Sequence, residues 1–165
     1  EPHFIYPKGQ GKDGILDVSL HTYVIRTPNF NILVDTCVGN DRKRAAIPEW
    51  NMMNTDYLAK IAAFGLQPED IHYVMCTHLH FDHVGWNTRL LDGRWVPTFP
   101  NARYIFHETE YEYWRDHQDH FAMDNSFADS ILPVVEAGRA DLVKGDFAID
   151  DSIWLAIASS CATRS

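Results

Sequence analysis

The chain has 165 residues, 45% of them hydrophobic and 22% charged, which is enough for one folded domain with a real core. Its formal net charge of −9 makes nucleic acid a poor partner, because a negative surface repels phosphate backbones. No apolar run approaches the ~20 residues that a membrane-spanning helix needs. The composition therefore predicts a single domain over residues 1–165 with neither nucleic acid nor a membrane as its partner.

The start of the chain and its cysteines bear on where the protein works. The first ten residues, EPHFIYPKGQ, lack the apolar segment of a signal peptide, which favours a cytoplasmic location. The chain begins with Glu1 rather than Met, so this inference concerns only the printed residues. The three cysteines, Cys37, Cys76 and Cys161, are odd in number and far apart, which is not the pattern of a disulfide framework.

The first third of the chain is expected to form a hairpin followed by a helix. Residues 15–25 and 31–34 are rich in β-branched and aromatic side chains and are separated by the turn sequence Thr27-Pro28-Asn29. Residues 54–56 supply good helix N-caps, helically spaced apolar residues follow, and Gly65 gives a stop.

The rest of the chain alternates in the same way. We expect a helical turn at residues 68–70, a buried strand at 71–76, a loop at 86–100, a strand at 102–106, helices at 108–114 and 124–136 (the second kinked near Pro133), and β structure at 147–157. Strands that alternate with helices predict a layered α/β domain.

Nine histidines are present, and three of them fall within the six residues HLHFDH. His78 and His80 are two positions apart, so on an extended chain both imidazoles point to the same side and can bind one metal ion. Leu79 and Phe81 would then point towards the core. A structural zinc site would more typically use paired cysteines, and those pairs are missing from the sequence.

The end of this segment offers a second pair of ligands. Asp82 and His83 follow where the chain leaves the strand, and a bend there lets them face the same pocket and bind a second metal. A single histidine is far more often a surface or core residue than a ligand. Three histidines and an aspartate after a buried strand are typical of a metal site.

Three segments carry a family resemblance. THLHFDHVGWN resembles the HxHxDH signature of the metallo-β-lactamase superfamily, above all in its lactonase-like and glyoxalase-like hydrolases. ILVDTCVGN and FPNARYIFHETEYEYW are similar to segments before and after that signature, so the resemblance covers residues 23–114. It implies an α/β (α+β layered) fold, the metallo-β-lactamase-like αββα sandwich, of which this chain supplies the N-terminal half only.

The resemblance also implies a chemistry. It makes the chain a zinc-dependent hydrolase, with one or two zinc ions or another divalent metal, in which metal-activated water attacks a lactone, ester or thioester of a small-molecule substrate. It assigns His78 and His80 to the first metal, and Asp82 and His83 to the second. Asp82 is also the expected catalytic residue, because a carboxylate there orients hydroxide or shuttles a proton.

Two nearby residues have open interpretations. Asp35 is expected either to orient a ligand histidine or to bond only to backbone at a strand end. Trp86 is expected either to form a wall of the substrate pocket or to close the edge of the core. The basic residues Arg42, Lys43 and Arg44 are expected to lie away from the motif, which disfavours phosphoesters as substrates.

The end of the chain departs from the family pattern. After residues 152–155, relatives carry a Pro-Gly-His-Thr segment with a third ligand histidine, and further on a bridging aspartate and a final histidine. Residues 156–165 do not match this pattern, which fits either a fragment or a truncated reading frame. The later histidines His107, His117 and His120 receive no ligand role from the resemblance. The alternative function is therefore a non-catalytic half-domain, which would form homo-oligomers through its exposed sheet.

Overall fold

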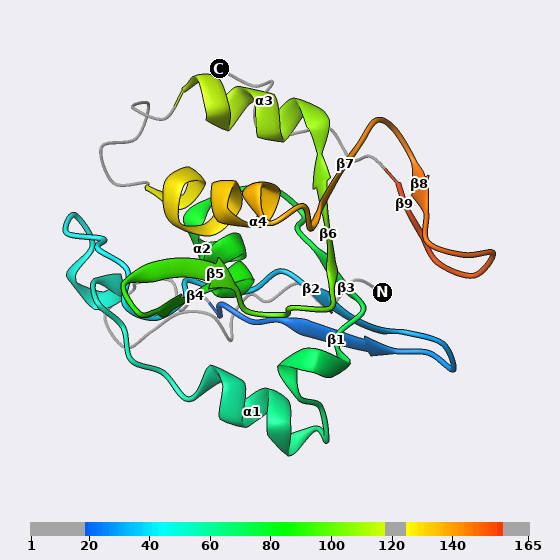
Figure 1. Cartoon of the computed structure of the whole chain (residues 1–165), viewed down its shortest axis with the longest axis horizontal. Helices are drawn as coiled ribbons and strands as arrows, with labels where there is room; N and C mark the ends of the chain where they lie inside the picture. The colour runs from blue at the N-terminus through cyan, green and yellow to red at the C-terminus, as the bar shows by residue number, and fades with distance from the viewer. Residues whose placement is uncertain (1–18, 118–124, 157–165) are drawn as a thin grey trace, which may run out of the picture.

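The fold is built on a five-stranded sheet in this computed structural model, which describes residues 19–117 and 125–156 (Figure 1). Its strands, in spatial order, are β1 (Tyr23–Arg26), β2 (Asn31–Val34), β3 (Tyr73–Met75), β6 (Arg103–His107) and β7 (Ala140–Val143). β1 and β2 pair antiparallel, which confirms the predicted hairpin, and the other neighbours pair parallel.

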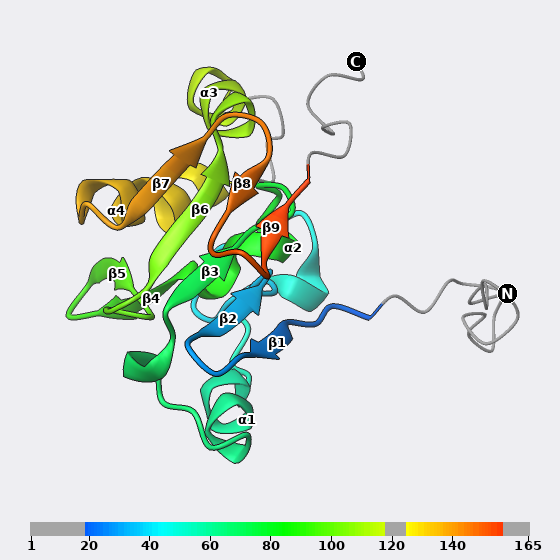
Figure 2. The ribbon, with the colours of Figure 1, turned by 90° about the vertical axis from the view of Figure 1, so that its right-hand side faces the viewer.

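Helices cover one face of this sheet and a small hairpin lies on the other. The helices are α1 (Tyr57–Ala63), α2 (Phe81–Val84), α3 (Glu108–Asp116) and α4 (Leu132–Glu136), with short turns η1 (Pro48–Trp50), η2 (Pro68–Asp70) and η3 (Gly85–Asn87) and the π-helical η4 (Phe127–Ile131). In Figure 2, β8 (Phe147–Ala148) and β9 (Trp154–Leu155) lie in front of the sheet, with α2 and α4 behind it. The layered α/β prediction is confirmed.

Burial on both faces explains why the inner strands read as continuous apolar runs. In β2, the neighbours Ile32 and Leu33 are both fully buried, but they belong to different clusters. Leu33 joins the large core under the helices, and Ile32 packs with residues that the β8–β9 hairpin covers. In β3, Val74 and Met75 divide in the same way.

The expectation of a loop at residues 86–100 is wrong. These residues contain β4 (Thr88–Leu91) and β5 (Arg94–Pro97), which form an antiparallel hairpin. Its turn is Asp92-Gly93, with φ of 49° and 75°, and Asp-Gly is a common pair for a two-residue hairpin turn because both residues need positive φ. The Asp-Gly pair was a turn signal in the sequence, but the Trp and Pro residues around it led us to interpret the whole segment as a loop.

The other predicted elements are mostly confirmed. The strands expected at 31–34, 71–76 and 102–106 and the helices expected after Asp56 and at 108–114 all form, and β7 is an additional strand. The helix expected at 124–136 changes from π to α geometry just before Pro133. Residues 15–18, 124 and 157 lie outside the described part of the chain.

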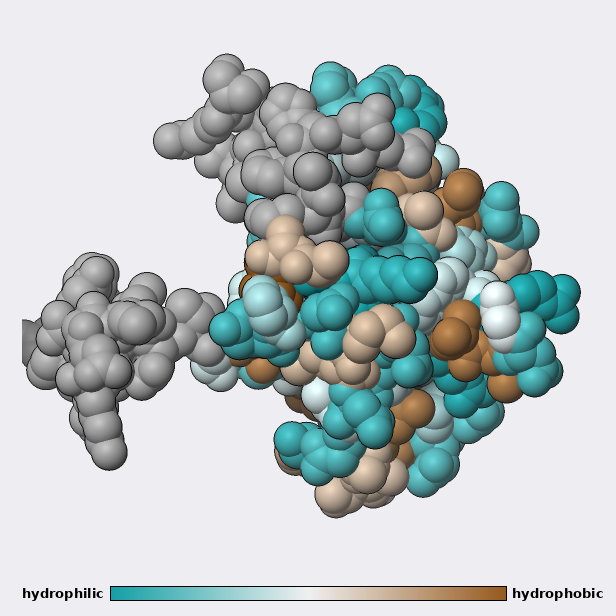
Figure 3. Space-filling model, turned by 90° about the vertical axis from the view of Figure 1, so that its left-hand side faces the viewer, coloured by the Kyte–Doolittle hydropathy of each residue, from teal (hydrophilic) through white to brown (hydrophobic). Residues whose placement is uncertain are grey.

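The surface of the described residues is mixed in character. Figure 3 shows hydrophilic and hydrophobic residues interspersed on one side of the molecule. Within residues 19–117 and 125–156, no helix is both long and apolar enough to cross a bilayer. Cys37 and Cys76 are free thiols, and Cys161 lies outside the described residues.

Candidate metal centre

The histidine-rich segment lies at the carboxyl end of β3, beside the end of β2. This is the edge at which open sheets of parallel strands place their binding sites. The segment is not extended as expected: the chain bends after Cys76, and α2 begins at Phe81 with a turn closed by His83 N–H donating to the His80 carbonyl at 2.9 Å. We expected strand alternation to bring His78 and His80 to one side of the chain, and here a bent segment brings them together instead.

All four predicted ligands come together in this turn. The ring centroid of His78 lies 4.6 Å from that of His80 and 3.9 Å from that of His83. The Oδ2 atom of Asp82 lies 3.4 Å from Nε2 of His83. Three imidazoles and a carboxylate therefore lie close together.

The two apolar residues of the motif behave differently from one another. Leu79 is 1% exposed and belongs to the main core, as expected. Phe81 is only partly buried, and its ring lies 5.2 Å from that of Trp50. The expectation that Phe81 points into the core is wrong, because α2 starts at this residue and strand alternation no longer holds.

Asp35 accepts hydrogen bonds both from a histidine of the motif and from backbone. Its carboxylate accepts hydrogen bonds from the backbone N–H and the hydroxyl of Thr77, at 2.8 Å each, and from Nδ1 of His83, also at 2.8 Å. Its φ of 57° is unusual for a residue with a side chain, and a conformation of this kind persists where several contacts determine it. Asp35 thus fixes the ring of His83 from the end of β2.

Two neighbouring carboxylates set the charge of His83. Burial alone would lower its pKa, but the hydrogen bonds to Asp35 and Asp82 outweigh burial and raise the pKa to about 9. Burial would raise the pKa of Asp82, and the hydrogen bond and charge of His83 instead hold it below its usual range. In this arrangement Nδ1 of His83 donates to Asp35, and Nε2 of His83 faces Oδ2 of Asp82 at 3.4 Å.

His78 has the opposite tendency. Burial, followed by the charges of His83 and His80, lowers the pKa of His78. His78 is therefore neutral at pH 7 and keeps a nitrogen lone pair, which is the form of histidine that binds metals.

The three imidazoles and the carboxylate are donors that suit a divalent metal. In this structure their donor atoms do not converge on a single position. Within the part of the chain that the structure describes, no three His, Cys, Asp or Glu side chains already converge as a metal-binding group. Nε2 of His83 lies 3.4 Å from Oδ2 of Asp82. The chemistry fits zinc, because imidazole nitrogen and carboxylate oxygen are its usual ligands and a carboxylate commonly holds the other nitrogen of a ligand histidine, as Asp35 does.

Thr36 and Asn87 are hydrogen-bonded next to the cluster, and neither was among the residues predicted for the site. The Thr36 N–H donates to the His83 carbonyl at 2.7 Å, and its hydroxyl donates to Oδ1 of Asn87 at 3.0 Å. Asn87 also donates to the Cys76 thiol at 3.5 Å. Both residues are fully buried. Thr36 lies in the VDT segment and Asn87 in the GWN segment. Their position in these segments could have identified them, but we used the segments only as evidence of resemblance.

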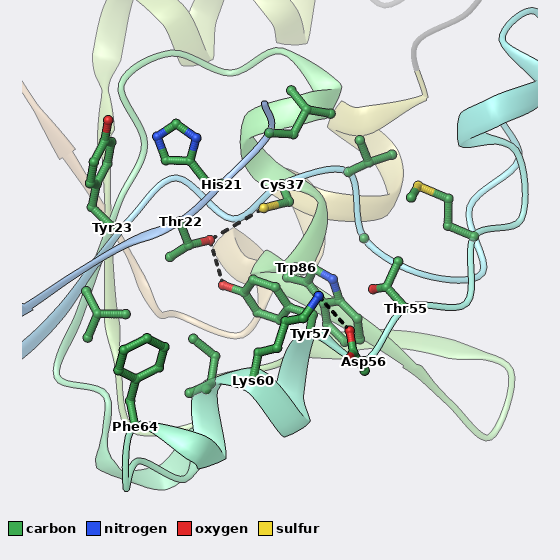
Figure 4. A pocket seen from close by; sticks show the side chains of 16 residues that line it. His21, Thr22, Tyr23, Cys37, Thr55, Asp56, Tyr57, Lys60, Phe64 and Trp86 are labelled. Carbon is green, nitrogen blue, oxygen red and sulfur yellow. Dashed lines mark hydrogen bonds and ion pairs between the residues drawn. The ribbon is translucent and has the colours of Figure 1, made fainter. Parts of the chain in front are cut away.

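Trp86 lies in the wall of a neighbouring cavity (Figure 4). It is 7% exposed and stacks on Tyr57 of α1 at 5.0 Å. The cavity, of about 540 Å³, lies between β1 and α1, and the hydroxyls of Thr22 and Tyr57 bond there at 2.9 Å, beside Cys37. The four candidate ligands are not among its lining residues. Trp86 therefore closes the core edge and also borders a cavity.

The later histidines have other partners. The ring of His107 accepts the Thr109 N–H at 3.3 Å and caps α3, and Nδ1 of His117 donates to the Tyr113 carbonyl at 2.8 Å. His120 lies outside the described residues.

Fold and cluster together define a class of protein. The chain belongs to the metallo-beta-lactamase superfamily, whose sequence model matches residues 17–153. Among curated relatives, it is 30% identical to the N-acyl homoserine lactonase AttM of Azorhizobium caulinodans over 116 residues, or 63% of this chain and 40% of that protein. It is 26% identical to an N-acyl homoserine lactonase of a Bacillus species over 154 residues, or 86% of this chain and 54% of that protein.

Solved structures agree with this assignment. A quorum-quenching N-acyl homoserine lactone lactonase superposes with a TM-score of 0.59 at 27% identity, covering 82% of this chain and 48% of the other. A probable metal-dependent hydrolase from Staphylococcus aureus gives a TM-score of 0.66 at 22% identity, covering 82% of this chain and 47% of the other, and shows the shared fold. The predicted family, fold class and resemblance to lactonases are confirmed. The chain spans 40–54% of the length of these relatives.

Proposed function

We propose that this chain carries the metal-binding part of a zinc-dependent hydrolase that opens lactones. The observation that carries the proposal is the cluster of His78, His80 and His83 with Asp82, held by Asp35 at the ends of parallel strands. A bound divalent ion would acidify a water molecule and polarise the carbonyl of the substrate.

The residues of the chain have distinct tasks in this proposal. His78 and His80 present ring nitrogens to the metal, and His83 does so through Nε2 once that atom gives up its proton. Asp35 keeps the ring of His83 in place through Nδ1. Asp82 is ionised at neutral pH, so its carboxylate can bind the metal and accept the proton that the attacking water loses.

The substrate class comes from the relatives. Two curated relatives are named N-acyl homoserine lactonases, so N-acyl homoserine lactones are the first substrates to test, before simple esters and thioesters. Hydrolysis would add one water to the ring ester and give a hydroxy acid, with release of a proton at neutral pH. That proton provides a direct readout of the reaction.

The first experiment measures zinc per chain by elemental analysis, for the wild type and for His78→Ala. We expect bound zinc in the wild type and a clear loss in the variant, because removal of one neutral imidazole takes away a ligand of the first metal. The matched control is His72→Ala, which changes a histidine outside the cluster, and we expect it to keep the zinc of the wild type. Proton release from N-acyl homoserine lactones is then measured on zinc-loaded protein.

Each outcome separates the two functions. Zinc that His78→Ala loses, together with proton release, supports the hydrolase. Zinc at background level in the wild type would contradict it and would favour the alternative, a non-catalytic chain without a complete set of ligands. Bound zinc without lactone hydrolysis would keep the metal site and overturn the activity.

A further inference from the structure

Arg42 is a fully buried arginine on the loop that follows β2. Our expectation that Arg42 lies away from the histidine motif is wrong. Its Nη2 atom donates to the carbonyl of Gly85, which is two residues after His83, and to the carbonyl and hydroxyl of Thr88 at 2.9 and 2.8 Å. Arg42 thus contacts both ends of η3, the turn through which the chain leaves α2.

The other side of the guanidinium contacts Asp129 and Trp95. Nη1 donates to the carboxylate of Asp129 at 2.7 Å and to its carbonyl at 3.1 Å. The guanidinium carbon lies 4.1 Å from the centre of the Trp95 ring on β5. A planar guanidinium with five fixed N–H groups is suited to join several segments in this way, and an ammonium group is not.

The loop and the end of α2 are packed without spare room. The Gly85 N–H donates to the Cys37 carbonyl at 2.7 Å, and a Cβ atom on Gly85 would lie 1.9 Å from the Val38 carbonyl. The loop that carries Arg42 and the end of α2 are therefore in direct contact at Gly85.

Arg44 is a natural comparison for Arg42. It is also buried, with 2% of its surface exposed, and it pairs with the same carboxylate of Asp129 at 2.9 Å. The described hydrogen bonds of its side chain go to Asp129 and to the Lys43 carbonyl, whereas those of the Arg42 side chain also reach the turn after α2.

We propose that Arg42 is a positioning residue for metal binding. Its hydrogen bonds to Gly85 and Thr88 fix α2, so that Asp82 and His83 are held next to His78 and His80. The inference rests on the proposed function, because it assumes that these four residues bind the metal.

The test compares Arg42→Lys with Arg44→Lys in the whole chain. Both substitutions keep the charge and weaken the contact with Asp129, so both are expected to lower the melting temperature. Metal affinity is measured by competition with a chromophoric chelator for Zn²⁺, well below each melting temperature, and the ligand geometry is read from the absorption spectrum with Co²⁺. We expect Arg42→Lys to lose about 10-fold or more in affinity and to change the Co²⁺ spectrum. Arg44→Lys should match the wild type in both measurements.

The outcomes are separable. Equal losses of affinity in both variants, or an unchanged affinity and spectrum in Arg42→Lys, would overturn the positioning role. If Arg42→Lys does not fold, Thr88→Val removes one acceptor of the guanidinium, and unchanged metal affinity in that variant would overturn the role too. A wild type that binds no metal would instead refute the proposed function.

Discussion

At the scale of single residues, Gly85 shows how closely two loops must approach at the candidate site. Gly85→Ala is expected to lower the free energy of unfolding by about 3 kcal/mol or more, because the new methyl group would overlap the backbone of Val38 and the main chain would have to move. Gly138→Ala is the control: Gly138 has φ of 67° and open space around it, so only the left-handed backbone costs energy, about 1–2 kcal/mol. Denaturant unfolding measures both, and equal losses would contradict the close approach.

At the scale of elements, β6 supports the turn that follows the motif. The hydroxyl of Tyr104 is buried, donates to the Asn87 carbonyl at 3.0 Å and accepts the Phe99 N–H at 3.0 Å. Tyr104→Phe would leave both backbone groups without this partner in the interior, so we expect a loss of about 1–3 kcal/mol in the free energy of unfolding. Tyr73→Phe, at a partly exposed position of β3, should change it far less. A similar small change in both variants would argue against this support.

At the scale of the whole molecule, the proposed metal would join the end of β3 to α2 and, through Asp35, to the end of β2. A ligand that binds only the folded state stabilises it, by about 2.7 kcal/mol when its free concentration is 100 times its dissociation constant. We therefore expect zinc to raise the melting temperature and EDTA to return it to the value of the metal-free chain. His78→Ala should respond to neither, and identical melting curves of the wild type with zinc and with EDTA would contradict the metal site.

The sequence by itself determined the features that depend on neighbouring residues. The four candidate ligands lie within six positions, so any turn at that point brings them close, whether the chain is extended or helical. Runs of strand length identified β2 and β3, and the capping and stop residues around residues 57–63 identified α1. Asp92-Gly93 also indicated the β4–β5 turn, although we had predicted a loop over residues 86–100.

Only the tertiary structure decided which distant residues serve the site. Asp35 and His83 are 48 positions apart, and Arg42 and Gly85 are 43 apart, so no local pattern links them. Their contacts exist because parallel pairing of β2 with β3 brings two strand ends together and because the loop after β2 packs directly on the turn after α2. Periodicity and turn chemistry act over a few residues, whereas partners across the fold depend on how the sheet and its loops pack.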